Sequence, residues 1–319
     1  MTAKRNNISR LTKLYLTARR PFLKESSYAH YVELAEHYIE PYLGKLQFED
    51  FNSSKAGEYI SRLKTEGRTS GKGGLSDKTI RDIWSLIKSI FYFAAENGYC
   101  SSDIRFPRLT LAKPSRMKSQ VLTAEHQKKL EAYLTANMSP ETLGIILCLY
   151  TGMRIGEICA LKWSDVDLES CLINVNRTVL RIKNTQSRGN QSKTVIVTGT
   201  PKTASSQRAI PVPKAIGKLL KKEGKHMPGD YYVATGSLHL MEPRRYYEKY
   251  KQILRKCGIT TDYTFHALRH TYATRCIESG IDPKVVSELL GHSSVTITLN
   301  RYVHPTMELK KRCVERLIQ

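Results

Sequence analysis

The sequence predicts an α+β protein that is mainly α: an all-helical domain followed by a mostly helical domain with a small antiparallel β-sheet. Two observations predict this fold class. A chain of 319 residues has room for about two domains that each bury a core. Apolar residues recur at helical spacing along most of the chain, and the period changes to that of β-strands only between residues 171 and 213.

The first domain is expected at residues 21–107, after a basic segment at residues 1–20. Apolar residues at helical spacing predict helices at residues 26–38, 53–64 and 76–97. The pair Ser53-Ser54 is expected to cap the second of these helices. Trp84 and Phe91 are expected in the core rather than as residues that stack on bases.

A linker that mixes prolines with basic residues is expected at residues 108–120, and the second domain at residues 121–319. The linker suits either a strap across DNA or an ordinary solvated connection. The second domain opens on a helix start capped by Thr123, and the apolar run at residues 142–150 predicts a buried helix. Strands are predicted at residues 173–182, 194–197 and 208–212. Helices resume at Pro213.

The chain is strongly basic throughout. Its net charge is +22, from 51 basic and 29 acidic residues, and its pI is about 9.7. Residues 1–113 hold 19 basic and 12 acidic residues, and the remainder holds 32 and 17. A neutral enzyme with one cationic tail does not fit this distribution. The charge indicates a polyanionic partner, for which nucleic acid is the first candidate.

The cysteines indicate a reducing compartment. There are seven, scattered and without a Cys-x-x-Cys pair, so neither disulfides nor a cysteine zinc site is expected. No signal peptide and no apolar run of spanning length is present in the sequence. We therefore expect a cytoplasmic protein that does not engage a membrane.

Four separated segments carry the side chains that phosphate chemistry uses. They are Thr-Gly-Met-Arg-Ile-Gly-Glu at 151–157, Pro-Lys-Thr at 201–203, His-Ala-Leu-Arg-His at 266–270, and Leu-Gly-His followed by Arg-Tyr at 290–302. If they converge, they offer two guanidiniums, an ammonium, two imidazoles and a phenol: Arg154, Arg269, Lys202, His266, His292 and Tyr302. This set suits attack by a tyrosine on a phosphodiester, with cations absorbing the charge that builds on the phosphate oxygens.

Two acidic or imidazole neighbours are expected to support this set. Glu157 lies one helical turn from Arg154 and is the nearest group that could hold its guanidinium, although an ordinary surface pair has the same spacing. His266 and Arg269 share a helix face. His270 and His266 are spaced as a zinc pair, but no glutamate follows as in His-Glu-x-x-His, so a supporting role for His270 is favoured over a metal.

The order and surroundings of the four motifs resemble the tyrosine recombinase (phage integrase) family, and most closely the integrases of conjugative transposons. The resemblance implies that Tyr302 attacks the phosphate and leaves a 3′-phosphotyrosine and a free 5′ hydroxyl. It implies that Lys202, on a β-hairpin between the last two predicted strands, protonates the departing oxygen. No cofactor is expected, because the sequence shows neither a phosphate-binding Gly-rich motif nor a carboxylate cluster for magnesium.

The resemblance also implies partners. The helical first domain would close one side of a clamp around double-stranded DNA, and four protomers would act on two duplexes, exchanging C-terminal tails. An accessory directionality factor is a further expected partner. Contacts to backbone phosphates, which add affinity without reading sequence, are expected from these residues: Arg68, Lys72, Lys78, Arg81, Arg244 and Arg245.

The function predicted is integration and excision of a mobile element in the bacterial cytoplasm. The basis within the family is an atypical first domain and a long β-insertion at residues 181–193. A chromosome-dimer resolvase and a type IB topoisomerase are the alternatives, and an inactive DNA-binding regulator is a third. Many conjugative-transposon integrases carry an arm-binding domain, for which the residues before Leu11 leave no room, so we expect that this domain is either naturally absent or removed.

Overall fold

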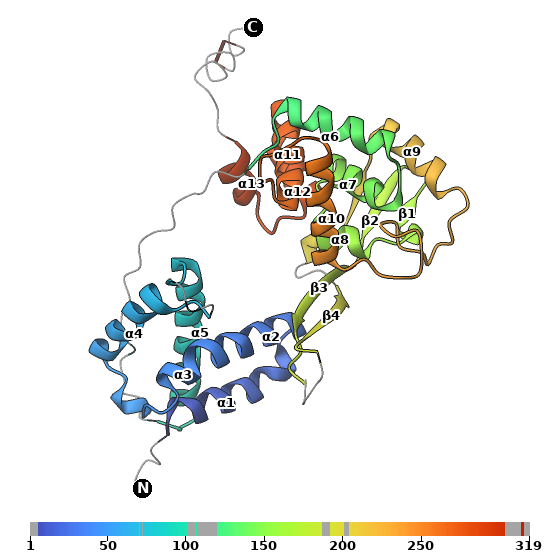
Figure 1. Cartoon of the computed structure of the whole chain (residues 1–319). Helices are drawn as coiled ribbons and strands as arrows, with labels where there is room; N and C mark the ends of the chain where they lie inside the picture. The colour runs from blue at the N-terminus through green and yellow to red at the C-terminus, as the bar shows by residue number, and fades with distance from the viewer. Residues whose placement is uncertain are drawn as a thin grey trace. The chain divides into compact units, whose positions relative to one another are not determined.

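A computed structural model describes residues 6–69, 71, 73–100, 106, 120–186, 192–200, 204–303 and 314–315. The chain forms two compact units, coloured from blue to red along the sequence in Figure 1. The first unit comprises residues 1–117 and 182–195, and the second comprises residues 118–181 and 196–319. The predicted fold class is confirmed, because the described residues are mostly helical with small antiparallel sheets.

The N-terminal part of the first unit is helical. Its elements are α1 (Ile8–Arg19), η1 (Arg20–Phe22), α2 (Glu25–Leu34), the π-helical turn η2 (Ala35–Ile39), α3 (Glu40–Leu43), η3 (Phe48–Asp50), α4 (Ser53–Glu66) and α5 (Asp77–Glu96). Helix α5 is stabilised at its start by Ser76, whose side chain accepts a hydrogen bond from the amide of Thr79. Phe91 is buried, and Trp84 packs with its ring centre 4.9 Å from that of Phe106, which confirms both as core residues.

Two local expectations for this unit were wrong. Helix α1 lies where only a basic segment was expected, because Ile8, Leu11 and Tyr15 recur on one face and are buried. Helix α4 is capped by Asn52, whose side chain accepts from the amide of Lys55, rather than by the serines that follow it.

The second unit combines helices with short strands. Its helices are α6 (Ala124–Ala136), α7 (Pro140–Thr151), α8 (Ile155–Ala160), η4 (Trp163–Asp165), η5 (Ala204–Ser206), α9 (Lys214–Gly224), α10 (Pro243–Lys256), α11 (Phe265–Glu278), α12 (Pro283–Leu290) and α13 (Val295–Tyr302). Its strands, two of which extend into residues grouped with the first unit, are β1 (Val166–Asp167), β2 (Leu172–Val175), β3 (Thr178–Lys183), β4 (Thr194–Gly199) and β5 (Arg208–Pro211).

The strands form two sheets instead of the single sheet expected. β2 pairs with β1 and β5, with Ile173 opposite Val166 and Ile210, whereas β3 pairs only with β4. The strand predicted at residues 173–182 therefore breaks in two. The break lies at Asn176 and Arg177, whose side chains both contact Asp165.

This topology corrects the strand pairing expected around residues 201–203. β4 and β5 flank residues 201–203 but belong to different sheets, so they are not the two strands of a hairpin. Lys202 itself lies outside the described residues. The β-insertion predicted at residues 181–193 corresponds to the far part of the β3–β4 ribbon, of which residues 187–191 also lie outside the described ranges.

Helix packing in the second unit places two chain turns together. The apolar helix α7 is buried, as predicted, and it packs against α11, which in turn packs against α12 and α13 (Figure 1). Gly152 ends α7 and Gly291 ends α12, with φ of 65° and 63°. None of the helices in the described ranges combines the length and apolar character needed to cross a membrane.

Candidate active site

The motifs at residues 151–157 and 290–302 meet where α7 and α12 end. A Cβ atom on Gly152 would lie 2.6 Å from side-chain atoms of Leu290 and Tyr272, so only glycine permits this approach. The chain after Gly152 then turns outward to Arg154, which occupies the N-cap position of α8. The chain after Gly291 leads to His292.

Arg154 is held by a buried carboxylate. Its Nη1 donates to Oε1 of Glu157 at 2.7 Å, and its backbone amide donates to Oε2 at 2.9 Å. Its Nη2 donates to the carbonyl of Gly291 at 3.2 Å. The Glu157 side chain is only 2% exposed, which rules out the ordinary surface pair considered from the spacing, while 37% of the Arg154 side chain stays accessible.

Arg269 is the most deeply buried charged group of the site, with 1% of the residue exposed. Its guanidinium donates to the carbonyls of Gly152 and Leu290, both at 2.7 Å. Such carbonyls at helix ends have no amide partner in the helix, so they compensate for part of the lost hydration. Burial and the nearby charge of Arg154 lower the pKa of Arg269 to about 9, which leaves it charged at neutral pH.

A third arginine, Arg208, was missed in the sequence. It donates from Nη2 to Oε2 of Glu157 at 3.0 Å and from Nε to the carbonyl of Leu289 at 2.6 Å. Burial alone would raise the pKa of Glu157, but Arg208 and Arg154 outweigh it and the pKa is lowered. One signal was available: Arg208 and the buried Ile210 are two apart on a strand and therefore face the same side.

The candidate nucleophile is buried against an imidazole. Tyr302 ends α13 with 7% of the residue exposed, and its Oη lies 2.7 Å from Nδ1 of His270. His270 thus contacts the phenol directly rather than supporting it from behind. The His292 ring lies parallel to that of Tyr302 with centres 6.4 Å apart, and its Nδ1 is 2.8 Å from Oγ1 of Thr298. The ring of His266 lies 4.4 Å from that of His270.

The imidazoles are neutral at pH 7. Desolvation, followed by neighbouring positive charges, lowers the pKa of His270 and of His292 to about 3. His266 reaches the surface, but the same two causes lower its pKa to about 4. Burial raises the pKa of Tyr302 even though Arg269 opposes it. The phenol is therefore protonated and faces a neutral nitrogen that can accept its hydrogen bond.

The residues expected to contact DNA are mostly at the surface. Arg68 and Lys78 are exposed in the first unit and Arg81 is half-buried, while Lys72 lies outside the described residues. At the start of α10, both Arg244 and Arg245 are exposed. The same helix buries Tyr246 and Tyr250, so it provides a basic face and aromatic core residues together.

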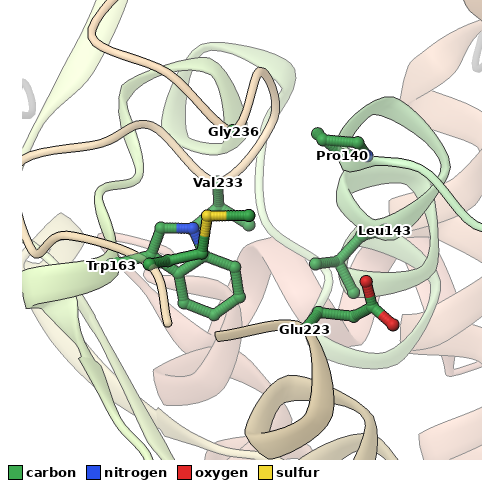
Figure 2. Close-up of a pocket in the computed structure, with 7 residues that line it drawn as sticks. Pro140, Leu143, Trp163, Glu223, Val233 and Gly236 are labelled. Carbon is green, nitrogen blue, oxygen red and sulfur yellow. The ribbon is translucent and has the colours of Figure 1, made fainter. Parts of the chain in front are cut away.

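Two cavities of the second unit lie away from the motif residues, and one of about 290 Å³ is lined by residues 251–262. Within the described ranges, no group of three His, Cys, Asp or Glu side chains is placed to hold a metal ion. A small cavity of about 10 Å³ has Trp163 on one side and Pro140 and Leu143 on the other (Figure 2). That volume holds about one water molecule, and none of the motif residues lines it.

The geometry defines a class of protein. One guanidinium is partly exposed and a second is buried near it, and a protonated phenol lies beside a neutral base in the same unit. This arrangement suits charge stabilisation at a phosphodiester and attack by tyrosine. It is the arrangement of a tyrosine-type DNA strand transferase.

The chain belongs to the phage integrase family, which matches residues 120–308. A XerC-like tyrosine recombinase from Caldanaerobacter subterraneus subsp. tengcongensis is 28% identical, over 94% of this chain and 78% of the relative. The transposase of transposon Tn916 from Enterococcus faecalis is 25% identical, over 96% and 77%. The Tn1549 transposon integrase in complex with transposon right end DNA has the same fold, with a TM-score of 0.75, 24% identity and coverage of 97% and 99%.

These findings confirm the resemblance noted from the motifs. The chain is a tyrosine site-specific recombinase, a family that cuts and rejoins DNA through a phosphotyrosine intermediate, and its relatives include the transposase of transposon Tn916. Solved relatives hold DNA, among them a λ integrase dimer bound to a core site, with a TM-score of 0.64 and 18% identity over 94% of this chain and 78% of that one.

Proposed function

We propose that this recombinase integrates and excises a mobile DNA element, using Tyr302 as its nucleophile. The observation that carries the proposal is the buried Tyr302 phenol on His270, in the same unit as the paired arginines Arg154 and Arg269. The likeness to the Tn916 transposase and the Tn1549 integrase supports the choice of element over the chromosome-dimer alternative.

In the cleavage step, Oη of Tyr302 forms a bond to phosphorus and the bond from phosphorus to the 5′ oxygen breaks. The phenol proton passes to Nδ1 of His270, and Lys202 gives a proton to the departing oxygen. Arg154 and Arg269 bind the non-bridging oxygens, where negative charge builds. Rejoining reverses these transfers with a 5′ hydroxyl from another strand, so the energy of the broken ester is kept in the phosphotyrosine.

Double-stranded DNA is the substrate, and its phosphates are held by surface cations. We assign this role to the following residues: Arg68, Lys72, Lys78, Arg81, Arg244 and Arg245. Removing one such contact should weaken binding to all sequences alike. It should also reduce the slope of log affinity against log salt concentration by about one. A loss confined to one DNA sequence would instead indicate contact with a base.

The working form is a tetramer that exchanges C-terminal tails on synapsed DNA. Exposed apolar side chains on or next to α12 and α13 support it, namely Ile281, Val285, Val295, Ile297 and Leu299, each 37–46% exposed. The tail after Met307 carries the apolar residues Val314, Leu317 and Ile318, which match these side chains in character. The tail of a neighbouring protomer covers these exposed side chains of α12 and α13. A directionality factor is a further partner, and the bacterial cytoplasm is the compartment.

The proposal is tested by strand exchange. DNA sites are first selected from random sequence, and two duplexes bearing them are incubated with the protein. A recombinase yields a four-way junction and exchanged products. Relaxation of supercoils without junctions would indicate a topoisomerase, and binding without any covalent adduct would indicate an inactive regulator.

The tail assignment is tested by deleting residues after Met307. Because the tail is expected to join protomers, the truncated protein should bind a single site normally yet fail to assemble synapsed tetramers. A matched variant, Val285→Ser with Ile297→Ser, removes exposed apolar side chains of α12 and α13 that would receive the tail, and it should give the same defect. Normal strand exchange by both proteins would show that the tail covers its own unit.

A further inference from the structure

Three consecutive carbonyls at the end of α12 each accept a hydrogen bond from a different arginine. Leu289 accepts from Arg208 at 2.6 Å, Leu290 from Arg269 at 2.7 Å, and Gly291 from Arg154 at 3.2 Å. These carbonyls lie at the negative end of the helix and lack amide partners within it. The three arginines come from β5, α11 and the turn before α8, so this helix end gathers three separate parts of the unit.

Arg208 differs from Arg154 in that its donors are used inside the protein. Its side chain is 6% exposed, against 37% for Arg154. Besides the carbonyl of Leu289, its guanidinium donates to both carboxylate oxygens of Glu157, at 3.0 and 3.3 Å, and to the carbonyl of Ser206 at 3.0 Å. A group saturated in this way has little capacity left for a substrate phosphate.

Glu157 links Arg208 to the exposed arginine. It is 2% exposed and is shared by two guanidiniums, with Arg154 bound through both its side chain and its backbone amide. If Arg208 is removed, the buried carboxylate keeps only one counter-charge and its orientation is no longer fixed from the β5 side. The end of α12 also loses one of its three attachments.

We propose that Arg208 is a positioning residue of the phosphate site: it fixes Glu157 and the end of α12 so that Arg154 presents its free face to a non-bridging phosphate oxygen. This inference rests on the proposed function and deepens it. Arg208 would act only through Arg154 and make no contact with DNA. Its loss should therefore reproduce the loss of Arg154 in part.

Arg208→Met should slow single-turnover cleavage by about 100-fold, the effect of misplacing a catalytic group by about 1 Å. DNA affinity should stay unchanged, because Arg208 is buried. Arg208→Lys keeps the charge but loses the planar fork, so it should restore only part of the rate. Combined with Glu157→Gln, Arg208→Met should add little further defect, because both act on Arg154.

A neutral substrate distinguishes positioning from a general loss of structure. In a methylphosphonate, a methyl group replaces one non-bridging oxygen of the scissile phosphate, so an arginine aimed at that oxygen has nothing to stabilise. On the diastereomer that makes Arg154→Ala harmless, Arg208→Met should also cleave at nearly the wild-type rate. A full Arg208→Met defect on that substrate, or a normal rate on ordinary DNA, would overturn the inference.

Control variants distinguish a failure of the positioning role of Arg208 from a failure of the proposed recombinase function. Arg177→Met removes another arginine of the same unit that is paired with a buried carboxylate, Asp165, and it should match wild type on both substrates. If Arg208→Met fails to unfold cooperatively, Arg208→Lys carries the comparison. Absence of any adduct with wild-type protein would refute the proposed function itself. If wild type reacts normally but Arg208→Met cleaves ordinary DNA at a normal rate, or keeps its full defect on the methylphosphonate, only the positioning role is refuted.

Discussion

The guanidinium of Arg269 is buried, whereas that of Arg154 is partly accessible to water. The two arginines should therefore contribute alike to cleavage but differently to the stability of the fold. Replacing either by alanine removes a charge aimed at the transition state, which should cost about 2.7–4 kcal/mol of its stabilisation, or about 100- to 1,000-fold in cleavage rate. Arg269→Ala also leaves the carbonyls of Gly152 and Leu290 unpaired, which should destabilise the fold by about 1–3 kcal/mol.

Arg154→Ala should lower stability much less, because Glu157 keeps its pair with Arg208. Single-turnover cleavage on suicide-nicked DNA and thermal unfolding of both variants measure the two effects. Equal stability of the two variants, or a defect confined to DNA binding with normal cleavage, would contradict these roles.

Lys202 is proposed as the proton donor because of its motif, and a change of leaving group tests this role. A 5′-thio leaving group departs without needing a proton. Lys202→Ala should therefore cut sulfur-bridged DNA almost as fast as wild type while cutting ordinary DNA slowly. Equal defects on both substrates would remove the proton-donor role and leave only a positioning role.

Among the elements, the turn that ends α12 carries the most consequence for the site. Gly291 has a φ of 63°, and a Cβ atom there would lie 2.9 Å from the carbonyl oxygen of Ser205 and 3.1 Å from Arg208. Gly291→Ala should therefore slow cleavage as well as cost about 1–3 kcal/mol for the strained backbone.

Gly280 provides a matched control, because its φ is 81° and a Cβ atom there meets nothing within 4 Å. Gly280→Ala should show the backbone cost without the loss of cleavage. The comparison is made by chemical unfolding and by cleavage rate. Similar cleavage by the two variants would show that the close contact at Gly291 is unimportant.

Helix α11 should make the second unit sensitive to acid. The unfolded chain protonates His270 near its ordinary pKa of 6.5, whereas the folded chain does so only near 3, so protonation between these values favours unfolding. The contribution of neutral His270 to the free energy of unfolding is fully present above pH 6.5. It is lost as the pH falls towards 3, by up to about 1.4 kcal/mol for each pH unit. Unfolding of wild type and His270→Gln at pH 7 and 5 tests this, and an equal decline in both would contradict it.

Elements with local start and stop signals could be predicted from the sequence. The bounds of α12 follow from Asp282, which caps it, and from Gly291, which ends it. The break between β2 and β3 could not be predicted, because it depends on the ion pair of Arg177 with Asp165, which lies 12 residues earlier in the sequence. Arg208 was missed for a similar reason: its partners Glu157 and Leu289 lie far away in the sequence.

Basic charge is spread over both halves of the chain, whereas the described residues of the candidate active site all lie in the second unit. Both halves of the chain are basic, which suits a protein that grips a polyanion along much of its length. In the second unit, Arg154 and Arg269 bind carbonyls of the turn at residues 290–291, and His270 contacts Tyr302. The motifs found from residue order alone therefore converge as expected, with Lys202 outside the described residues.

Tyr302 is the residue that this site is expected to join to DNA. The direct measurement is to trap the protein on suicide-nicked DNA, digest it and identify the DNA-linked peptide by mass spectrometry. Wild type should yield one adduct, on Tyr302, and Tyr302→Phe should yield none while binding the same DNA with nearly unchanged affinity, since it loses only the phenol oxygen. An adduct on a different tyrosine, or one formed by Tyr302→Phe at the wild-type rate, would show that Tyr302 is not the nucleophile.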